Sequence, residues 1–348
     1  MNTYPNNTKI ALVVPTIRGE SIKRFLEEWK AHITRYDVTI FIIEDNPEPT
    51  FDLNFCKNKF NLIHYSWLDF KKELGENSWI IPRRNASIRS FGFYMAYKNG
   101  FDIIVTLDDD CYPLDNYIKV DNYDYFGTCL KRLCSYELKL EERRWESTVL
   151  NIRPRGFPYR NLTTERIFKN LNIILNHGLW ANIPDLDAPN QLLGFTSDYR
   201  NYIIDTLIPP RMYFPMCGMN IVFKKEAVPA LYFLLMNMGE NDEKYPYDRF
   251  DDIWAGVFFK KICDHLGYHV VSGHPIVWHD RQSDVFRNLQ KEAKGIEMNE
   301  KLWKIVDEIQ LESDNFADCY KELANKLPLN DEYFSKLKRA MTIWADLF

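Results

Sequence analysis

Residues 102–113 read D-I-I-V-T-L-D-D-D-C-Y-P, an apolar run that ends in three consecutive aspartates. The run from Ile103 to Leu107 has the β-branched, apolar character of a buried strand. Asp108, Asp109 and Asp110 then fall at the carboxyl end of that strand, where open α/β sheets bind their ligands. The stretch therefore predicts a central strand with a ligand site at its end.

The three aspartates favour a cation at this position. Adjacent carboxylates repel one another strongly unless positive charge neutralises them. Mg²⁺ or Mn²⁺ takes oxygen ligands and is commonly shared between carboxylates and substrate phosphates. Because alternate residues of a strand point to opposite faces, Asp108 and Asp110 can face the metal while Asp109 faces elsewhere. The other interpretation is a solvated acidic turn after a strand, which is a common feature.

The segments around this strand alternate between strand and helix patterns, which predicts a doubly wound, mostly parallel α/β sheet with flanking helices. No G-x-G-x-x-G follows the first strand, so a dinucleotide fold of the usual kind is disfavoured. The expected strands are 9–14, 38–44, 61–67, 147–153, 213–223 and 269–278, and the expected helices are 20–34, 84–98, 164–176, 226–237, 252–266 and several turns after residue 298.

Composition narrows the class of protein. The 348 residues carry a net charge of −5, so no basic excess indicates a nucleic-acid partner. No apolar run approaches the ~20 residues of a membrane helix, and the first residues lack the apolar core of a signal peptide. The seven cysteines show no C-x-x-C spacing, which favours free thiols in a reducing cytoplasm over a zinc site or a disulfide framework.

Several segments together resemble one family, the reversibly glycosylated polypeptides, or UDP-arabinopyranose mutases, of plants. They lie in the family's order over roughly residues 10–295, and the set is specific although each segment alone is weak. The segments are V-V-P-T-I-R (13–18), R-N-A-S-I-R-S-F-G-F (84–93), L-D-D-D-C (107–111), R-G-F-P-Y-R (155–160), H-G-L-W-A-N-I-P-D-L-D-A-P (177–189), C-G-M-N-I-V-F (217–223), D-D-I-W-A-G (251–256) and P-I-V-W-H-D-R-Q-S-D-V-F-R-N-L-Q-K-E (275–292).

The resemblance implies a GT-A-like fold, Mn²⁺ or Mg²⁺, and interconversion of the pyranose and furanose forms of a UDP-sugar. It also implies reversible self-glycosylation on an arginine, which is carried over to Arg155. The family's second arginine follows seven residues later, whereas Arg160 here follows after five, so the local register departs. Residues 1–295 are expected to form the catalytic domain, and the helical extension 296–348 is expected to pack on it or to serve in homo-oligomerisation.

Three arginines are candidates for the diphosphate, because a guanidinium forks two bonds to phosphate. These are Arg18, Arg84 and Arg89, each with a surface salt bridge as the alternative. Asp251 and Asp252 head a predicted helix, where carboxylates are favoured. They are either helix caps or catalytic carboxylates that hold sugar hydroxyls or act as a base.

The remaining candidates follow the ends of strands. His279 matches the family's histidine and is assigned to the metal with Asp108 and Asp110, with a structural histidine as the alternative. The nucleotide is expected to meet Pro15, Thr16, Asp45 and Asp109. Asp185 and Asp187 either contact the sugar or shape their loop, and Trp180 and Trp254 are expected in the core.

Two other functions fit the same residues. One is a glycosyltransferase of the same fold that moves the sugar to an external acceptor. The other is a non-catalytic, self-glycosylated scaffold subunit, against which the clustered aspartates argue, because a binding module need not retain charges so costly to cluster.

Overall fold

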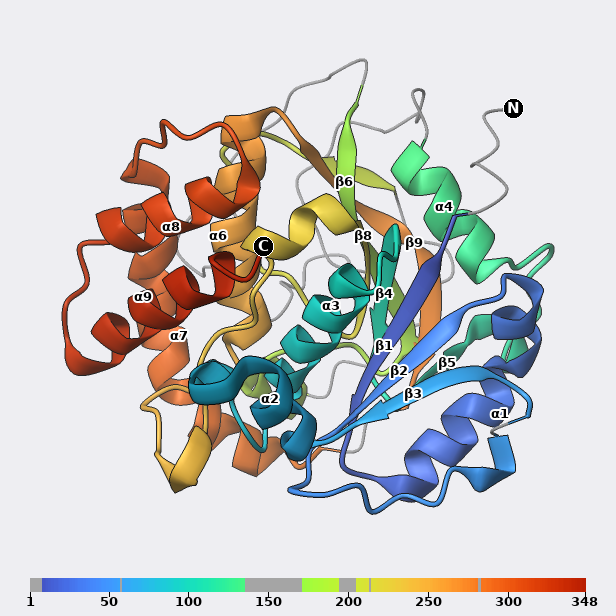
Figure 1. Ribbon diagram of the computed structural model, residues 1–348. Coiled ribbons are helices and arrows are strands. Elements are labelled where there is room, and N and C mark those ends of the chain that lie inside the picture. Colours follow the sequence, from blue (N-terminus) through green and yellow to red (C-terminus); the bar gives the residue numbers. More distant parts are fainter. Residues whose placement is uncertain (1–7, 57, 135–170, 194–204, 213, 281–282) are drawn as a thin grey trace.

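The computed structural model describes residues 8–56, 58–134, 171–193, 205–212, 214–280 and 283–348 (Figure 1). Within these residues nine strands form one sheet in the order β3-β2-β1-β4-β8-β6-β9-β5, with β7 also paired to β9. The strands are β1 (Ile10–Thr16), β2 (Thr39–Glu44), β3 (Asn61–Tyr65), β4 (Ile103–Leu107), β5 (Cys111–Pro113), β6 (Ile173–Asn182), β7 (Thr206–Ile208), β8 (Asn220–Lys224) and β9 (His269–His279).

Helices lie on both faces of this sheet (Figure 1). The α-helices are α1 (Gly19–Arg35), α2 (Trp67–Leu74), α3 (Arg89–Lys98), α4 (Tyr125–Cys134), α5 (Ala188–Leu192), α6 (Asp251–Leu266), α7 (Val285–Glu308), α8 (Phe316–Lys326) and α9 (Glu332–Ala345). The α/β class with a helical C-terminal part is therefore confirmed.

The strand directions differ between the two halves of the sheet. β3, β2, β1 and β4 are parallel, as expected from their helical crossovers. β8 then pairs antiparallel to β4, and the described pairings divide into four parallel and four antiparallel. The sheet is therefore mixed, whereas the sequence predicted mostly parallel strands. An apolar run predicts a buried strand but carries no information about its direction.

Alternation along β1 separates two hydrophobic cores. Ile10, Leu12 and Val14 belong to the cluster that contains the buried faces of α1 and α4. Ala11 and Val13 belong to the other cluster, which contains α3, α6 and the C-terminal helices. Successive side chains of a strand point to opposite faces, so a strand buried on both sides is apolar throughout.

A glycine allows α3 to lie close to the central strand. A Cβ atom on Gly92 would lie 2.4 Å from Cγ1 of Val13, closer than carbon atoms can approach. This close approach matters for the site, because α3 begins with Arg89, whose side chain reaches the end of β4.

Two predicted helices have a different structure. Residues 225–230 form a short 3-10 helix with Pro229 inside it, and the buried residues from Leu231 to Met236 are not helical. An apolar run buried on all sides has no periodicity that distinguishes helix from other structure. Ile173 begins β6 rather than lying in a helix over 164–176. Residues 164–170 of that predicted helix lie outside the described part, as does the expected strand 147–153.

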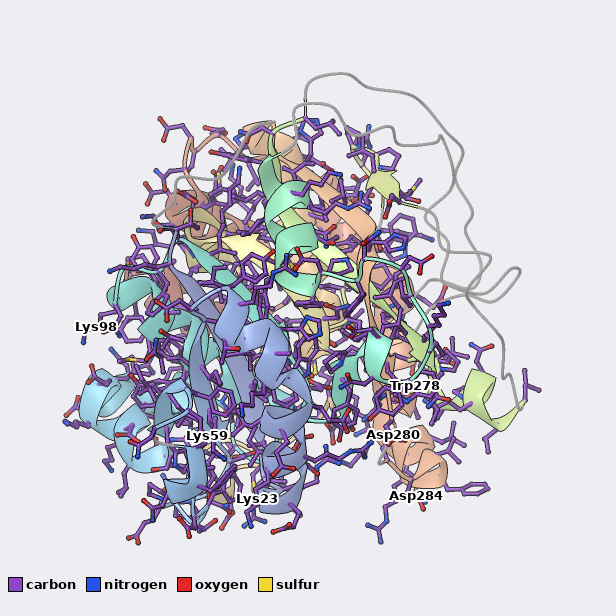
Figure 2. The ribbon with its side chains drawn as sticks, turned by 90° about the vertical axis from the view of Figure 1, so that its right-hand side faces the viewer. Lys23, Lys59, Lys98, Trp278, Asp280 and Asp284 are labelled. Carbon is purple, nitrogen blue, oxygen red and sulfur yellow. The ribbon has the colours of Figure 1, made fainter. Side chains whose placement is uncertain are left out.

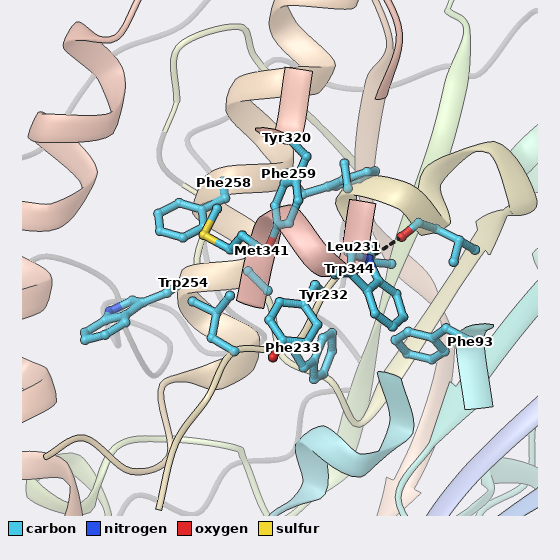
Figure 3. Packing of buried hydrophobic residues seen from close by; sticks show 14 of the residues in the cluster. Phe93, Leu231, Tyr232, Phe233, Trp254, Phe258, Phe259, Tyr320, Met341 and Trp344 are labelled. Carbon is cyan, nitrogen blue, oxygen red and sulfur yellow. Dashed lines mark hydrogen bonds between the residues drawn. The ribbon is translucent and has the colours of Figure 1, made fainter. Parts of the chain in front are cut away.

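The C-terminal helices share a core with the sheet-covering helices. Figure 3 shows Tyr320 of α8 and Met341 and Trp344 of α9 packed among side chains of α6 and the buried segment around Tyr232. The expected boundary at residue 295 falls inside α7, which runs without interruption from Val285 to Glu308. The division into two domains and the role of the extension in homo-oligomerisation stay predictions.

Trp344 offers a test of this packing. Its ring stacks on Tyr232 with centroids 5.2 Å apart, and its Nε1 donates to the carbonyl of Val228 at 3.1 Å. Trp344→Phe leaves a cavity and removes one hydrogen bond, so the free energy of unfolding should fall by about 1–3 kcal/mol. Chemical denaturation measures this change, and Trp67→Phe, in a partly exposed site, is the comparison. An unchanged unfolding midpoint would contradict the described packing.

Two general expectations can be compared with the described residues. No helix in this part of the chain is both long enough and apolar enough to span a membrane. The six cysteines whose side chains are described are free and buried, as expected from their scattered spacing.

Candidate active site

The three aspartates after β4 point to three different partners. Asp109 faces the end of β1, where it accepts a hydrogen bond from Thr16 Oγ1 at 2.5 Å and one from Arg18 Nε at 3.2 Å. Burial raises the pKa of Asp109, and the bonds from Arg18 and Thr16 oppose that rise. Asp109 thus ties the loop after β1 to the loop after β4, on the side of the site expected to bind the nucleotide.

Asp110 lies between Arg18 and His279. Its Oδ2 lies 3.3 Å from Arg18 Nη2, and its Oδ1 lies 4.0 Å from His279 Nε2. Burial raises the pKa of Asp110 to about 6, and the negative charges of Asp108 and Asp109 add to the rise. The ionised form of this carboxyl is therefore costly until more positive charge is supplied.

His279 is oriented as metal-binding histidines usually are. It ends β9, opposite Cys111 of β5, and its ring is buried. Nδ1 lies 2.7 Å from the carbonyl oxygen of Ile183, so Nδ1 carries the proton and donates it to that carbonyl. Nε2 lies on the side of Asp110, 4.0 Å from its Oδ1, and a hydrogen bond made by the other ring nitrogen is what fixes the orientation of a histidine ligand.

These donors fit a hard divalent cation with an incomplete protein shell. Across the described ranges no group of three acidic, histidine or cysteine side chains is close enough to hold a metal as it stands. Asp110 and His279 supply one oxygen and one nitrogen. Mg²⁺ and Mn²⁺ often take only one or two protein ligands and complete their shell with substrate phosphate and water.

Asp108 is paired with Arg89. The guanidinium of Arg89 is buried, and it donates to Asp108 Oδ1, to Thr106 Oγ1 at 3.0 Å, and to the carbonyl oxygens of Ala86 and Gly218. Arg89 thus binds four groups around the end of β4. That Arg89 binds the diphosphate stays a prediction. In this structure its hydrogen bonds join Ala86, Gly218 and Asp108 to one another.

The loops after β1 and β2 meet beside these residues. The amide of Asp45 donates to the carbonyl of Thr16 at 2.9 Å, which places Pro15, Thr16 and Asp45 together as the sequence predicts. The carboxylate of Asp45 accepts from Trp67 Nε1 at 2.8 Å and from the amide of Asn85 at 2.9 Å. Asp45 therefore braces the neighbouring segments, on the edge expected to meet the base or ribose.

A pocket of about 250 Å³ opens next to Asp108. Its charged lining residues come from five separate segments of the chain. Its acidic residues are Asp108, Asp185, Asp248, Asp251 and Asp252, and its basic residues are Arg84, Arg89, Arg249 and Lys291. Carboxylates suited to sugar hydroxyls and cations suited to phosphate thus line one cavity at the carboxyl end of β4.

Asp251 and Asp252 are both buried at the start of α6 and bond to segments outside it. Asp251 Oδ2 accepts from Ser87 Oγ at 2.8 Å, and Asp252 Oδ2 accepts from the amide of Gly218 at 2.8 Å. Ser87 lies just before α3, and Gly218 lies just before β8, the strand that pairs with β4. These two hydrogen bonds therefore fix the start of α6 beside the site. Both carboxylates line the pocket, which keeps the catalytic prediction open.

Other candidates separate clearly. Arg84 is exposed with a left-handed backbone (φ +53°), and it lies before α3 rather than in a helix. Asp185 lines the pocket and accepts from Cys217 Sγ at 2.8 Å, whereas Asp187 accepts from the amide of Asn190 and caps α5. Trp180 and Trp254 are buried, as predicted for core residues, and Arg155 and Arg160 lie outside the described residues.

The sequence interpretation did not single out the charged pocket residues Asp248, Arg249 and Lys291, or Cys217 beside them. Each lies in or next to a family-like segment: Arg249 two residues before D-D-I-W-A-G, and Lys291 near the end of the 275–292 segment. Charged residues in such segments were the available signal. Their position relative to the aspartates depends on how α7 packs, which no local pattern describes.

The end of β9 is held in place by contacts of Trp278 and Asp280. Trp278, Asp280 and Asp284 lie near one another in Figure 2, away from Lys98. Trp278 stacks on Tyr117 with centroids 4.7 Å apart, and Asp280 Oδ2 lies 3.1 Å from Arg24 Nη1. These contacts hold the end of β9, and hence His279, against α1 and the segment after β5.

Comparisons with known proteins show the family to which this chain belongs. A family model described as "Reversibly glycosylated polypeptide" matches residues 5–125 and 155–348. "UDP-arabinopyranose mutase 1" of Arabidopsis thaliana is 32% identical over 352 residues, covering 97% of this chain and 91% of its own. "UDP-arabinopyranose mutase 1" of Oryza sativa subsp. japonica is 32% identical over 352 residues, covering 97% of this chain and 90% of its own.

Among solved structures, S. aureus TarS 1–349 in complex with UDP-GlcNAc covers 98% of this chain and 90% of its own, at 10% identity and a TM-score of 0.43. That similarity is too low to support an argument, so the family model and the curated relatives decide the assignment. Since the model matches most of the chain and the relatives cover nearly all of it, this chain belongs to the reversibly glycosylated polypeptide family.

Proposed function

We propose that this chain is a UDP-sugar mutase that interconverts the pyranose and furanose forms of a UDP-arabinose-like substrate. The observation that supports it most is the pocket beside Asp108, which joins Asp251 and Asp252 to the cations Arg249 and Lys291. Relatives 31–33% identical over nearly the whole chain are named UDP-arabinopyranose mutase.

The proposed binding mode divides the substrate between two neighbouring regions. The loops that carry Thr16, Arg18 and Asp45 receive the nucleoside, and the pocket beside Asp108 receives the sugar. Asp110 and His279 would hold Mn²⁺ or Mg²⁺ between them. The metal, when bound, supplies positive charge that stabilises the departing diphosphate.

The reaction moves bonds at C1 and leaves the composition unchanged. The C1–O bond to the β-phosphate breaks, and its electron pair leaves with UDP. The ring oxygen later leaves C1 and takes up a proton, while another sugar hydroxyl loses a proton and its oxygen bonds to C1. UDP then bonds to C1 again. Asp251 or Asp252 is proposed to hold these hydroxyls and carry the proton between them.

Arg155 is proposed to hold the sugar while UDP is detached. In the covalent version, a nitrogen of Arg155 loses a proton and bonds to C1, and it regains that proton when the C1–N bond breaks. The high pKa of an arginine makes this nitrogen a poor nucleophile unless a base assists. In the electrostatic version, Arg155 holds UDP, and glycosylation of the arginine is a side reaction of the same cationic sugar.

One incubation tests the mutase against its alternatives. The full chain with UDP-arabinopyranose and Mn²⁺, without acceptor, should give the furanose isomer by chromatography. Intact mass should show a sugar adduct on the peptide that contains Arg155, and excess UDP should remove it. Transfer to an added acceptor without furanose formation would instead indicate a glycosyltransferase, and no turnover of either kind would indicate a scaffold.

We also propose that the protein works in the cytoplasm. Six described cysteines are free thiols, which is the usual state in a reducing compartment such as the cytoplasm. UDP-sugar is the proposed partner molecule.

A further inference from the structure

The first half of α7 buries a polar face. Asn288, Glu292, Gly295 and Asn299 are all buried and follow one another at helical spacing. A helix packed against a protein core normally buries apolar residues. A buried carboxylate such as Glu292, with 0% exposure, costs free energy unless it is paired and hydrogen-bonded. This face of α7 therefore has a task other than filling the core.

Glu292 uses both carboxylate oxygens to join two segments of the pocket. Its Oε1 accepts from Arg249 Nε at 2.8 Å, and its Oε2 accepts from the amide of Ala188 at 2.8 Å. Arg249 lines the pocket directly, and Ala188 follows the loop of Asp185, which lines it too. Glu292 thus sets the position of a pocket cation without lining the pocket itself.

The backbone at Arg249 is held in an unusual conformation. Its φ of +64° lies in the left-handed region, which is unfavourable for a residue with a side chain and persists only where the surroundings enforce it. α7 packs closely against the next residue, because a Cβ on Gly295 would lie 2.2 Å from the ring of Phe250. Strain of this kind concentrates at functional sites.

The charges around the pocket indicate a role for the guanidinium of Arg249. The C1–O cleavage proposed above places a further negative charge on the β-phosphate, in a cavity that already contains Asp108, Asp251 and Asp252. A guanidinium is the side chain best shaped to take two phosphate oxygens. Lys291 adds a second charge but is engaged by Asp248 at 2.9 Å.

We infer that Arg249, positioned by Glu292, binds the β-phosphate of UDP at the edge of the pocket and retains the nucleotide on the protein while the sugar rearranges. This inference rests on the proposed function only in taking a UDP-sugar as the ligand. It assigns a diphosphate-binding role to Arg249 and a positioning role to Glu292.

The experiment measures binding by calorimetry with full-length protein and Mn²⁺, using UDP and uridine as probes. Arg249→Met should weaken UDP binding by about 10- to 100-fold, the value of a hydrogen bond to a charged group, and change uridine binding by less than about twofold. Glu292→Gln should weaken UDP binding less, and should have no further effect in the Arg249→Met background, because it acts through the arginine.

Arg211→Met is the matched control. Arg211 also has a left-handed backbone (φ +61°) and an acidic partner, Asp307, but it does not line the pocket. The Arg211→Met variant should leave UDP affinity unchanged.

If Arg249→Met lowers the melting temperature strongly, the Arg249→Lys variant is measured in its place, since lysine retains the charge and cannot fork two bonds to phosphate.

Two results would overturn the inference: wild-type UDP affinity in a folded Arg249 variant, or an equal loss for UDP and uridine, which indicates a structural role. Mutase activity is assayed separately on the wild type. If the Arg249 variant loses UDP binding but the wild type makes no furanose, the proposed function is refuted and this inference is supported.

Discussion

Asp110→Asn is expected to lower mutase activity by at least about 100-fold while the protein stays folded, since loss of even an outer partner of a metal ligand costs 10–100-fold. Asp110 is 8% exposed and lies between Arg18 and His279, so asparagine keeps the shape of the side chain. It removes the negative charge that a divalent cation needs. The rate of furanose formation at saturating Mn²⁺ and the melting temperature are the two measurements.

Chelation and a matched variant complete this test. EDTA should abolish activity of the wild type, and Mn²⁺ should restore it. Asp115→Asn removes a carboxylate from a partly exposed position beside His32, and it should leave the activity unchanged. His279→Ala should raise the Mn²⁺ concentration required for activity. Full activity in the chelated wild type would remove the metal from the proposal.

Arg89→Met is expected to lower the free energy of unfolding by about 3–5 kcal/mol, the range found when one partner of a buried ion pair is removed. Arg89 is 1% exposed, and its guanidinium bonds to Asp108, Thr106 and two carbonyl oxygens. Methionine fills part of the volume but leaves those acceptors without a donor. Activity should fall as well, because Asp108 loses its position beside the pocket.

Urea denaturation followed by tryptophan fluorescence measures this loss. Arg24→Met is the control, because Arg24 is also ion-paired, to Glu28 and Asp280, but its side chain is 42% exposed. Exposed ion pairs contribute only about 0–1 kcal/mol, so the control should shift the midpoint little. Equal midpoints for the Arg89 and Arg24 variants would show that the buried guanidinium does not stabilise the fold as described.

The local patterns of the chain predicted its central elements correctly. The strand before Asp108, the helix over 252–266 and the late strand that ends near His279 are all present. Each is encoded within a short window, as a β-branched run or a 3.6-residue repeat. Because parallel strands align their carboxyl ends, the same patterns also placed Thr16, Asp45 and Asp109 together.

Local patterns failed where several structures suit the same residues. The buried segment around Tyr232 is apolar throughout, so its predicted helix had no periodic support. The assignment of Asp108 and Asp110 to the metal and of Asp109 to the nucleotide stays a prediction. In the structure Asp108 pairs with Arg89, a residue that the sequence assigned to the diphosphate.

By itself, the sequence determined the α/β class, the acidic site at the end of β4 and the family, since these depend on residues close together in the chain. Only the tertiary structure decided which charges meet. Asp110 and His279 are 169 residues apart, and Arg249 and Glu292 are 43 apart. Ion pairs depend on distance in space, which the packing of β9 and α7 sets, so side chains that form one pocket leave no joint pattern in the sequence.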